Sequence, residues 1–187
     1  MINKKISIAI LGPESTGKTE LALYLARHFG GVYYEEISRK YVEALNRPYQ
    51  IDDLDVITNL QIEQYHSMCE SDKFFHVFDT EFIITKIWYE WVFKQLPVDF
   101  KNILVELRFD LYLLCSPDIP WIPDPVRENG GEARNKLFDE YKNELQRFGY
   151  NFRIVEGDGQ QRINCALSHL FDVFPVLKNI NNCSSTQ

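Results

Sequence analysis

Short apolar runs alternate with segments of helical periodicity along most of the chain. Five runs rich in β-branched and aromatic residues predict buried strands, at residues 6–11, 32–34, 74–78, 109–115 and 152–155. Apolar residues at helical spacing predict helices between and after them, at residues 18–29, 38–45, 53–65, 81–96, 135–148 and 160–174. Strands and helices that alternate in this way predict a three-layer α/β/α sandwich around a five-stranded parallel sheet.

Composition and charge narrow the class of protein. The chain has 187 residues, with 20 Lys and Arg against 27 Asp and Glu, which gives a formal net charge of −7. An acidic chain of this kind is a poor general binder of nucleic acid or of anionic membranes. Its four cysteines and four histidines are scattered without zinc-ligand spacing, which is typical of a reducing compartment. The run at 6–11 is too short for a membrane span or a convincing signal peptide, so we expect a cytoplasmic protein with no nucleic-acid or membrane partner.

A phosphate-binding motif lies between the first predicted strand and the first predicted helix. It matches G-x-x-x-x-G-K-[ST] in full and reads Gly12-Pro13-Glu14-Ser15-Thr16-Gly17-Lys18-Thr19. The glycines permit backbone angles that a side chain would block, and the amides between them can form a concave nest around phosphate oxygens. We therefore expect a P-loop that binds a nucleoside triphosphate, with Lys18 on the β- and γ-phosphates and the Thr19 hydroxyl on Mg²⁺.

A Mg²⁺–nucleotide site usually needs an acid at the end of a neighbouring strand. Asp79 closes the run at 74–78 and is the best candidate. The alternative is an ordinary aspartate that caps the segment after the strand. The position at a strand end favours the first interpretation, so Thr19 and Asp79 form the predicted metal site.

A P-loop by itself does not separate a kinase from a GTPase switch or a motor ATPase. No Asp completes a guanine-reading NKxD motif after Asn135-Lys136, and no D-x-x-G ends the third predicted strand. A ring-forming mechanical ATPase would normally carry a separate helical lid domain, for which little chain remains. These absences favour a small kinase.

The segment between the fourth and fifth predicted strands suits that design. Arg127 precedes Gly130-Gly131, and Arg134 follows them. A phosphoryl-transfer enzyme needs a mobile lid that excludes water and brings guanidinium groups to the transferring phosphoryl. The alternative is a solvated loop with surface ion pairs.

The chain resembles the ribosylnicotinamide kinase domain of the NadR type, which belongs to the P-loop kinases and to an AAA-like ATPase domain family. The resemblance spans about residues 6–156. It rests on the P-loop, on Glu36-x-x-Arg39-x-Tyr41, on Phe78-Asp79-Thr80-Glu81-Phe82 with Thr85, and on Pro120-Trp121-x-x-Asp124-x-x-Arg127. Members of this family transfer phosphate from ATP to the 5′-hydroxyl of nicotinamide riboside and form nicotinamide mononucleotide.

The sequence pattern predicts one P-loop kinase domain over residues 1–177, nucleoside/nucleotide-kinase-like with a small lid at about 120–135, a polar tail at 178–187, and ATP and Mg²⁺ as cofactors. The resemblance implies Asp79 near the metal and acceptor, and Arg127 as a lid arginine. Family members often carry Asp-Gly where this chain has Asp124-Pro125, which bears on lid geometry and substrate choice. Bifunctional members add an N-terminal adenylyltransferase domain; because the P-loop strand starts at Ile6, we expect adenylyl transfer to belong to another protein.

The acceptor site is less well defined by the sequence. Asp79 or Glu36 is expected to orient the acceptor hydroxyl. Glu36 and Arg39 are candidates to hold the acceptor ribose, and Asp124 is a further candidate for substrate binding. A cationic pyridinium ring can stack on an aromatic side chain, for which Trp121 ranks above Trp88, since Trp88 has the helical spacing of a core residue. Two alternatives stay open: a kinase for another nucleoside or small metabolite, and a regulatory ATP-binding module without catalysis.

Overall fold

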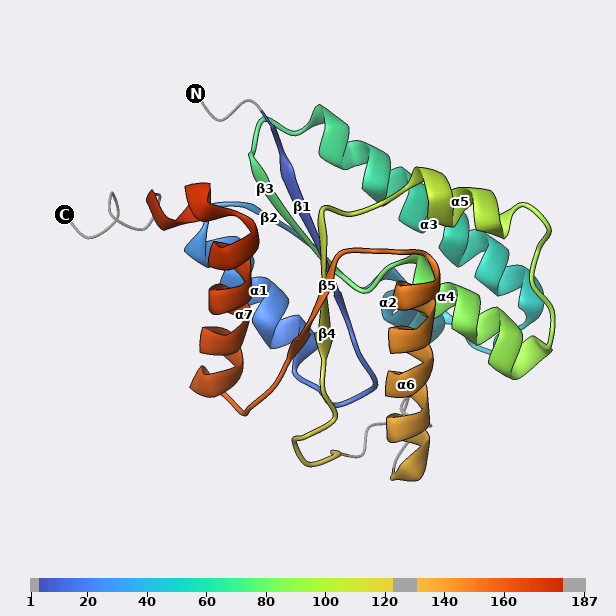
Figure 1. Cartoon of the computed structure of the whole chain (residues 1–187). Coiled ribbons are helices and arrows are strands. Elements are labelled where there is room, and N and C mark those ends of the chain that lie inside the picture. Colours follow the sequence, from blue (N-terminus) through green and yellow to red (C-terminus); the bar gives the residue numbers. More distant parts are fainter. Residues whose placement is uncertain (1–3, 123–130, 180–187) are drawn as a thin grey trace.

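A five-stranded parallel sheet forms the centre of the molecule (Figure 1). The computed structural model describes residues 4–122 and 131–179. The strands occur in the order β2-β3-β1-β4-β5 and are β1 (Ile6–Leu11), β2 (Val32–Tyr34), β3 (Phe75–Asp79), β4 (Leu111–Cys115) and β5 (Phe152–Val155). Every neighbouring pair is parallel. The predicted α/β fold class is confirmed.

Helices cover both faces of the sheet, as Figure 1 shows. One face carries α1 (Lys18–His28) and α7 (Gln160–Val173). The other face carries α2 (Ile37–Ala44), α3 (Ile51–Glu70), α4 (Phe82–Trp88), α5 (Phe100–Glu106) and α6 (Glu132–Arg147). None of the helices in the described ranges is long and apolar enough to cross a bilayer.

The alternation of side chains along β1 divides the core into two layers. Ile8 and Ile10 pack with α1 and α7, whereas Ala9 and Leu11 pack with the helices of the other face. All six residues of β1 are buried, which explains why the strand reads as a continuous apolar run rather than as an alternating one.

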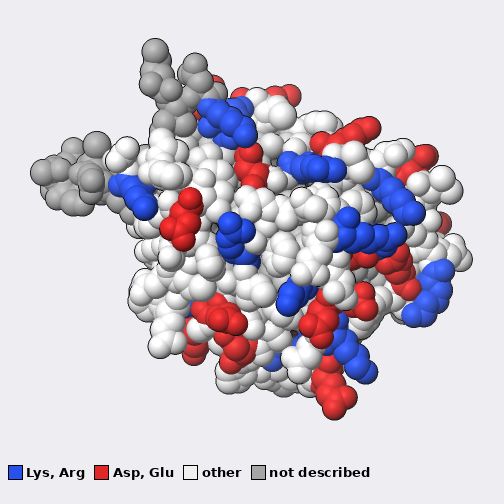
Figure 2. Space-filling model, viewed as in Figure 1, with Lys and Arg blue, Asp and Glu red and all other residues white. Residues whose placement is uncertain are grey.

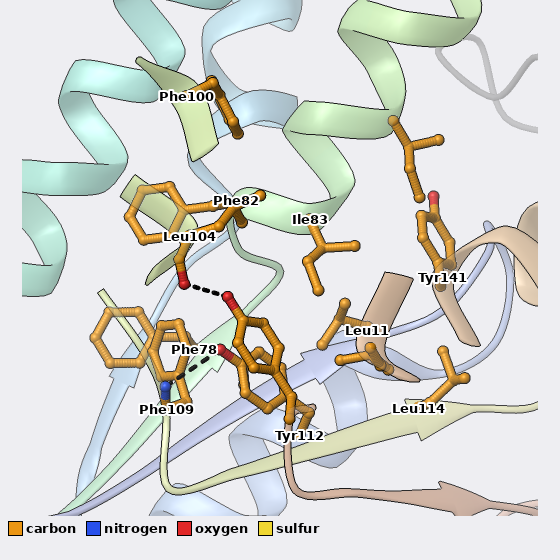
Figure 3. Packing of buried hydrophobic residues seen from close by; sticks show 14 of the residues in the cluster. Leu11, Phe78, Phe82, Ile83, Phe100, Leu104, Phe109, Tyr112, Leu114 and Tyr141 are labelled. Carbon is orange, nitrogen blue, oxygen red and sulfur yellow. Dashed lines mark hydrogen bonds between the residues drawn. The ribbon is translucent and has the colours of Figure 1, made fainter. Parts of the chain in front are cut away.

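Aromatic rings fill the layer between the sheet and helices α3 to α6 (Figure 3). Tyr112 stacks on Tyr150 with a ring-centroid distance of 4.6 Å, and its hydroxyl accepts the Phe109 amide at 3.2 Å. The hydroxyl of Tyr150 donates to the Leu104 carbonyl. Both buried phenols thus keep a hydrogen-bond partner, so these large residues fill the core without leaving a polar atom unsatisfied.

Some elements differ from the sequence prediction. The single helix expected at 81–96 is α4 followed by a π-helical turn, Tyr89–Phe93. Helix α5 was not predicted, because Phe100 and Leu104 give only one turn of apolar spacing. A short 3-10 helix, Pro175–Asn179, was not predicted, and it buries Leu177.

Candidate active site

The carboxyl ends of β1 and β3 lie side by side and bring the P-loop next to Asp79. Ile10 pairs with Asp79 in the parallel ladder, and the chain continues from β1 through the P-loop into α1. As a result, Thr19 Oγ1 donates a hydrogen bond of 2.6 Å to Asp79 Oδ2. The two residues proposed from sequence to hold a metal therefore lie in direct contact.

Asp79 is only 2% exposed. Its Oδ2 atom also accepts a bond of 3.3 Å from the Tyr33 hydroxyl, and its Oδ1 atom has no hydrogen-bond partner in the described ranges 4–122 and 131–179. Burial raises the pKa of the Asp79 carboxyl, whereas the Lys18 ammonium and the Thr19 hydroxyl act to lower it. A buried carboxylate oxygen without a donor fits a cation, since Mg²⁺ prefers oxygen ligands and takes one or two carboxylates together with phosphate and water.

The P-loop has the backbone geometry of an anion nest. Ser15 and Gly17 have positive φ angles of 55° and 70°, and Thr16 between them does not. Gly12 has φ 145°, and a Cβ atom there would lie 2.6 Å from the Cys115 carbonyl oxygen, so only glycine fits. Such an alternation of backbone conformations turns successive amides toward one concave surface.

Side chains of the P-loop bond to its own backbone. Lys18 Nζ donates to the Pro13 carbonyl at 2.8 Å, and Thr16 Oγ1 donates to the same oxygen at 2.9 Å. These bonds close the loop on itself and hold the lysine ammonium against it. Lys18 begins α1, with Gly17 as the N-cap, so the positive end of the helix dipole meets the loop as well.

A cleft of about 1320 Å³ runs from the P-loop toward α2 and α4. Its P-loop end is lined by all motif residues except Pro13, namely Gly12, Glu14, Ser15, Thr16, Gly17, Lys18 and Thr19. Glu36, Arg39 and Trp88, three of the residues proposed from sequence for the acceptor, also line it. Asp79 does not line the cleft and lies behind Thr19.

Glu36 follows β2 and occupies the N-cap position of α2, where its side chain makes no capping hydrogen bond. Burial raises the pKa of its carboxyl, Lys18 opposes the rise, and the negative charge of Asp79 adds to it. The same interactions show that Glu36, Lys18 and Asp79 share one electrostatic environment. A carboxylate with a raised pKa beside a phosphate site has the properties of a general base.

An aromatic wall closes the far end of the cleft. It consists of Tyr49, Trp88, Trp91 and Phe93. The Tyr49 and Trp88 rings meet edge to face with centroids 4.9 Å apart. Trp121 is half-buried and does not line the cleft, although its neighbours Pro120 and Ile122 do. The structure thus places Trp88 in the cleft lining and Trp121 outside it, although the sequence analysis ranked Trp121 first.

Arg47 and Tyr49 line the cleft but were missed by the sequence analysis. Arg47 forms a two-pronged ion pair with the buried Asp53, at 2.7 and 2.8 Å, and Tyr41 donates to the same carboxylate at 2.9 Å. These contacts raise the pKa of Arg47 above its ordinary value and lower the pKa of Asp53 below its own. The only sequence signal was the apposition of Arg47 and Asp53 six positions apart across a proline turn.

The predicted lid residues fall partly outside the described ranges. Asp124 and Arg127 lie in the segment 123–130, which is not described. Arg134 is buried in the first turn of α6, where Nη1 donates to the Ile119 carbonyl and Nη2 to the Ser15 carbonyl, both at 3.1 Å. Arg134 therefore contacts the P-loop backbone directly.

Comparison with known proteins places this site in context. The chain is 29% identical over 142 residues to the trifunctional NAD biosynthesis/regulator protein NadR of Salmonella typhimurium, and equally to that of Escherichia coli. The alignment covers 71% of this chain but 33% of either relative, so the chain spans only about a third of the length of these curated proteins.

Solved structures of NadR show the same fold. A crystal structure of NadR in complex with NR superposes with a TM-score of 0.79 at 27% identity, over 90% of this chain and 51% of that chain. A crystal structure of NadR in complex with NAD and AMP-PNP superposes with a TM-score of 0.70 at 25% identity, over 90% of this chain and 49% of that chain. Deoxyadenosine kinase from M. mycoides superposes with a TM-score of 0.62 at 14% identity, over 89% of this chain and 100% of that chain. This likeness is one of fold alone.

A family model described as AAA domain (AAA_28) matches residues 7–162. The matched region begins in β1, includes the P-loop and Asp79, and ends in the first turn of α7. It therefore contains the whole sheet except Ile6 and all of the cleft lining. The chain belongs to this AAA domain family.

Proposed function

We propose that the protein is an ATP-dependent kinase that phosphorylates nicotinamide riboside to nicotinamide mononucleotide. The observation that carries this proposal is one continuous cleft that is lined by Lys18 and Thr19, by Glu36 and by the aromatic wall. Its volume of about 1320 Å³ exceeds that of most small-molecule pockets and suits two substrates bound end to end. The similarity to NadR, one structure of which contains NR and another AMP-PNP, supports the same assignment.

The charges of the cleft outside the P-loop favour a nucleoside over a phosphorylated acceptor. Arg39 Nε bonds to Glu43 at 2.8 Å, and Arg47 bonds to Asp53. Both cleft arginines are thus already neutralised by carboxylates, while Glu36 adds negative charge. A cationic pyridinium riboside suits this environment better than an acceptor that carries a phosphate group.

Each residue has a proposed role. Lys18 and the P-loop amides hold the phosphate chain, and Thr19 with Asp79 hold Mg²⁺, which neutralises charge on the β- and γ-phosphates. Glu36 is the proposed base for the acceptor hydroxyl, because it lines the cleft while Asp79 is engaged by Thr19. Trp88 is the proposed stacking partner of the pyridinium ring.

Other parts of the proposal rest on the resemblance. Arg127 as a lid arginine and Asp124 as an acceptor contact belong to it. The lid at about 120–135, the domain at 1–177 with its tail at 178–187, and the cytoplasmic location are proposed from the sequence pattern. Asp158 lines the cleft, and the neighbouring Gly157 amide donates to Asp118 Oδ2 at 2.7 Å. This loop after β5 is the proposed contact for adenine.

Mass spectrometry of the product tests the proposal. After incubation with Mg-ATP and nicotinamide riboside, we expect nicotinamide mononucleotide and an equal amount of ADP. ADP release that depends on a different nucleoside in a panel would identify another kinase. Acceptor-independent nucleotide binding, with hydrolysis changed only by a protein partner, would instead identify a regulatory module.

A further inference from the structure

Ser15, in the middle of the P-loop, is held by two segments that lie far away in the sequence. Its hydroxyl donates to the Ile122 carbonyl and accepts from the Ile122 amide, both at 3.2 Å. Its own carbonyl accepts a bond of 3.1 Å from Arg134 Nη2. The second arm of the same guanidinium, Nη1, donates to the Ile119 carbonyl at 3.1 Å.

These contacts oppose an unfavourable backbone conformation. Ser15 has φ 55°, in the left-handed region that residues other than glycine seldom adopt. Such a conformation persists only where the surrounding structure fixes it, and it is found most often at ligand sites. Arg134 is 6% exposed, so its bonds to the loop are shielded from competing water.

The bond to the Ser15 carbonyl also fixes a neighbouring amide. The Ser15 carbonyl and the Thr16 N–H belong to one planar trans peptide, because the structure has no cis peptide bond in its described ranges. In a trans peptide the two groups point in opposite directions. An arginine that holds the carbonyl on one side therefore turns the Thr16 amide to the other side, and Thr16 lines the cleft.

We propose that Arg134 is a positioning residue that orients the Ser15–Thr16 peptide, so that the Thr16 amide serves the phosphate chain of the nucleotide. This inference rests on the proposed ATP-binding function. It differs from the role expected from the sequence, in which Arg134 supplies charge directly to the transferring phosphoryl. The geometry favours positioning, because both guanidinium nitrogens named above are bound to main-chain carbonyls.

The two roles predict different kinetics. An oriented amide is present before and after transfer. Its loss therefore weakens the binding of ATP and of ADP to the same extent and leaves kcat nearly unchanged at saturating ATP. A guanidinium that contacts the transferring phosphoryl acts mainly in the transition state. Its loss therefore lowers kcat and leaves the affinity for ADP unchanged.

Titration calorimetry and steady-state kinetics of Arg134→Ala test the proposal. We expect the Kd of both ATP and ADP to rise about 10-fold, with kcat within about 3-fold of the wild-type value and the acceptor KM unchanged. Lys136→Ala is the matched control, because it removes a positive charge from an exposed position of the same helix. We expect that variant to bind both nucleotides as the wild type does.

Arg134→Lys separates charge from geometry, and it also serves if Arg134→Ala does not fold. Lysine keeps the charge but lacks the planar fork that reaches two carbonyls, so both nucleotides should bind about 3-fold to 10-fold more weakly. Wild-type affinity for both nucleotides in either variant, or a loss of kcat with unchanged ADP affinity, would overturn the positioning role. Failure of the wild-type protein to bind ATP would instead contradict the proposed function.

Discussion

Thr19 Oγ1 and Asp79 Oδ2 lie 2.6 Å apart and join the first turn of α1 to the last residue of β3, across 60 positions of sequence. The contact exists because β1 and β3 are neighbours in a parallel sheet, so that both chain ends reach the same edge. It places a hydroxyl and a carboxylate together beside the P-loop. Function here depends on strand order, since another order would separate the two groups.

Asp79→Asn tests the metal role of this contact. Asparagine still accepts the Thr19 hydrogen bond but lacks the charge that holds a divalent cation. We expect kcat/KM to fall by about 100-fold or more and the Mg²⁺ concentration for half-maximal activity to rise, while ATP binds with wild-type affinity in the absence of Mg²⁺. Asp172→Asn, an exposed position on α7, is the control; an unchanged Mg²⁺ requirement in Asp79→Asn would remove Asp79 from the metal site.

Lys18→Ala tests the assignment of the P-loop to phosphate transfer. The lysine charge is expected to stabilise the transition state, so its removal should lower kcat/KM by about 100-fold or more, a loss of ~3 kcal/mol. Circular dichroism shows whether the variant is folded. Lys101→Ala, at an exposed position of α5, is the matched control. Normal turnover by a folded Lys18→Ala protein would refute the role of the lysine.

The sequence was sufficient for the parts of the site that depend on local pattern. The P-loop spacing and the strand-terminal position of Asp79 are short-range signals. The structure has the P-loop between β1 and α1 and Asp79 at the end of β3, as the sequence indicates. The sequence analysis ranked Trp121 above Trp88, whereas the cleft lining includes Trp88 and not Trp121, because helical spacing does not tell which helix face meets a cleft. The Arg47–Asp53 pair depends on the conformation of the irregular segment between α2 and α3, which the apolar spacing of the flanking helices does not encode.

Glu36→Gln tests the proposed general base through the pH dependence of kcat. A base acts in its deprotonated form, and burial raises the pKa of Glu36 above its ordinary value of 4.5. Wild-type kcat should therefore rise with pH through the raised pKa and then level off. Glu36→Gln should lose this acid limb and fall by about 100-fold or more at the plateau. Glu63→Gln, exposed on α3, should keep the wild-type profile; an acid limb that survives in Glu36→Gln would assign the base to another group.

Replacement of the two tryptophans tests the aromatic wall. Trp88→Ala should raise the KM of nicotinamide riboside by about 3-fold to 30-fold and leave the KM of ATP unchanged, since it removes a cation–π contact at one end of the cleft. Trp88→Phe keeps a ring and should lose less. Trp121→Ala should have little effect on the acceptor KM, because Trp121 does not line the cleft. The opposite ranking would return the pyridinium site to Trp121.

His76 in β3 connects the fold to pH. The ring is fully buried, with Nδ1 3.1 Å from the Tyr34 hydroxyl and Nε2 2.8 Å from the Lys73 carbonyl. Burial lowers the pKa of His76 below its ordinary value of 6.5, the Lys73 carbonyl opposes this, and the charge of Lys5 adds to it. Below pH 6.5 the unfolded chain therefore binds a proton that the folded chain binds only at lower pH.

The stability of the folded state should accordingly fall as pH decreases from about 6.5, by at most about 1.4 kcal/mol per pH unit from this one group. His76→Gln keeps an amide that can accept from Tyr34 and donate to Lys73 but does not titrate, so its free energy of unfolding relative to wild type should increase as the pH is lowered. Urea unfolding at pH 7.5, 6.5 and about 5.5 measures the difference. His66→Gln, exposed on α3, should remain parallel to wild type. A constant difference between His76→Gln and wild type across this range would show that His76 titrates alike in the folded and unfolded chains.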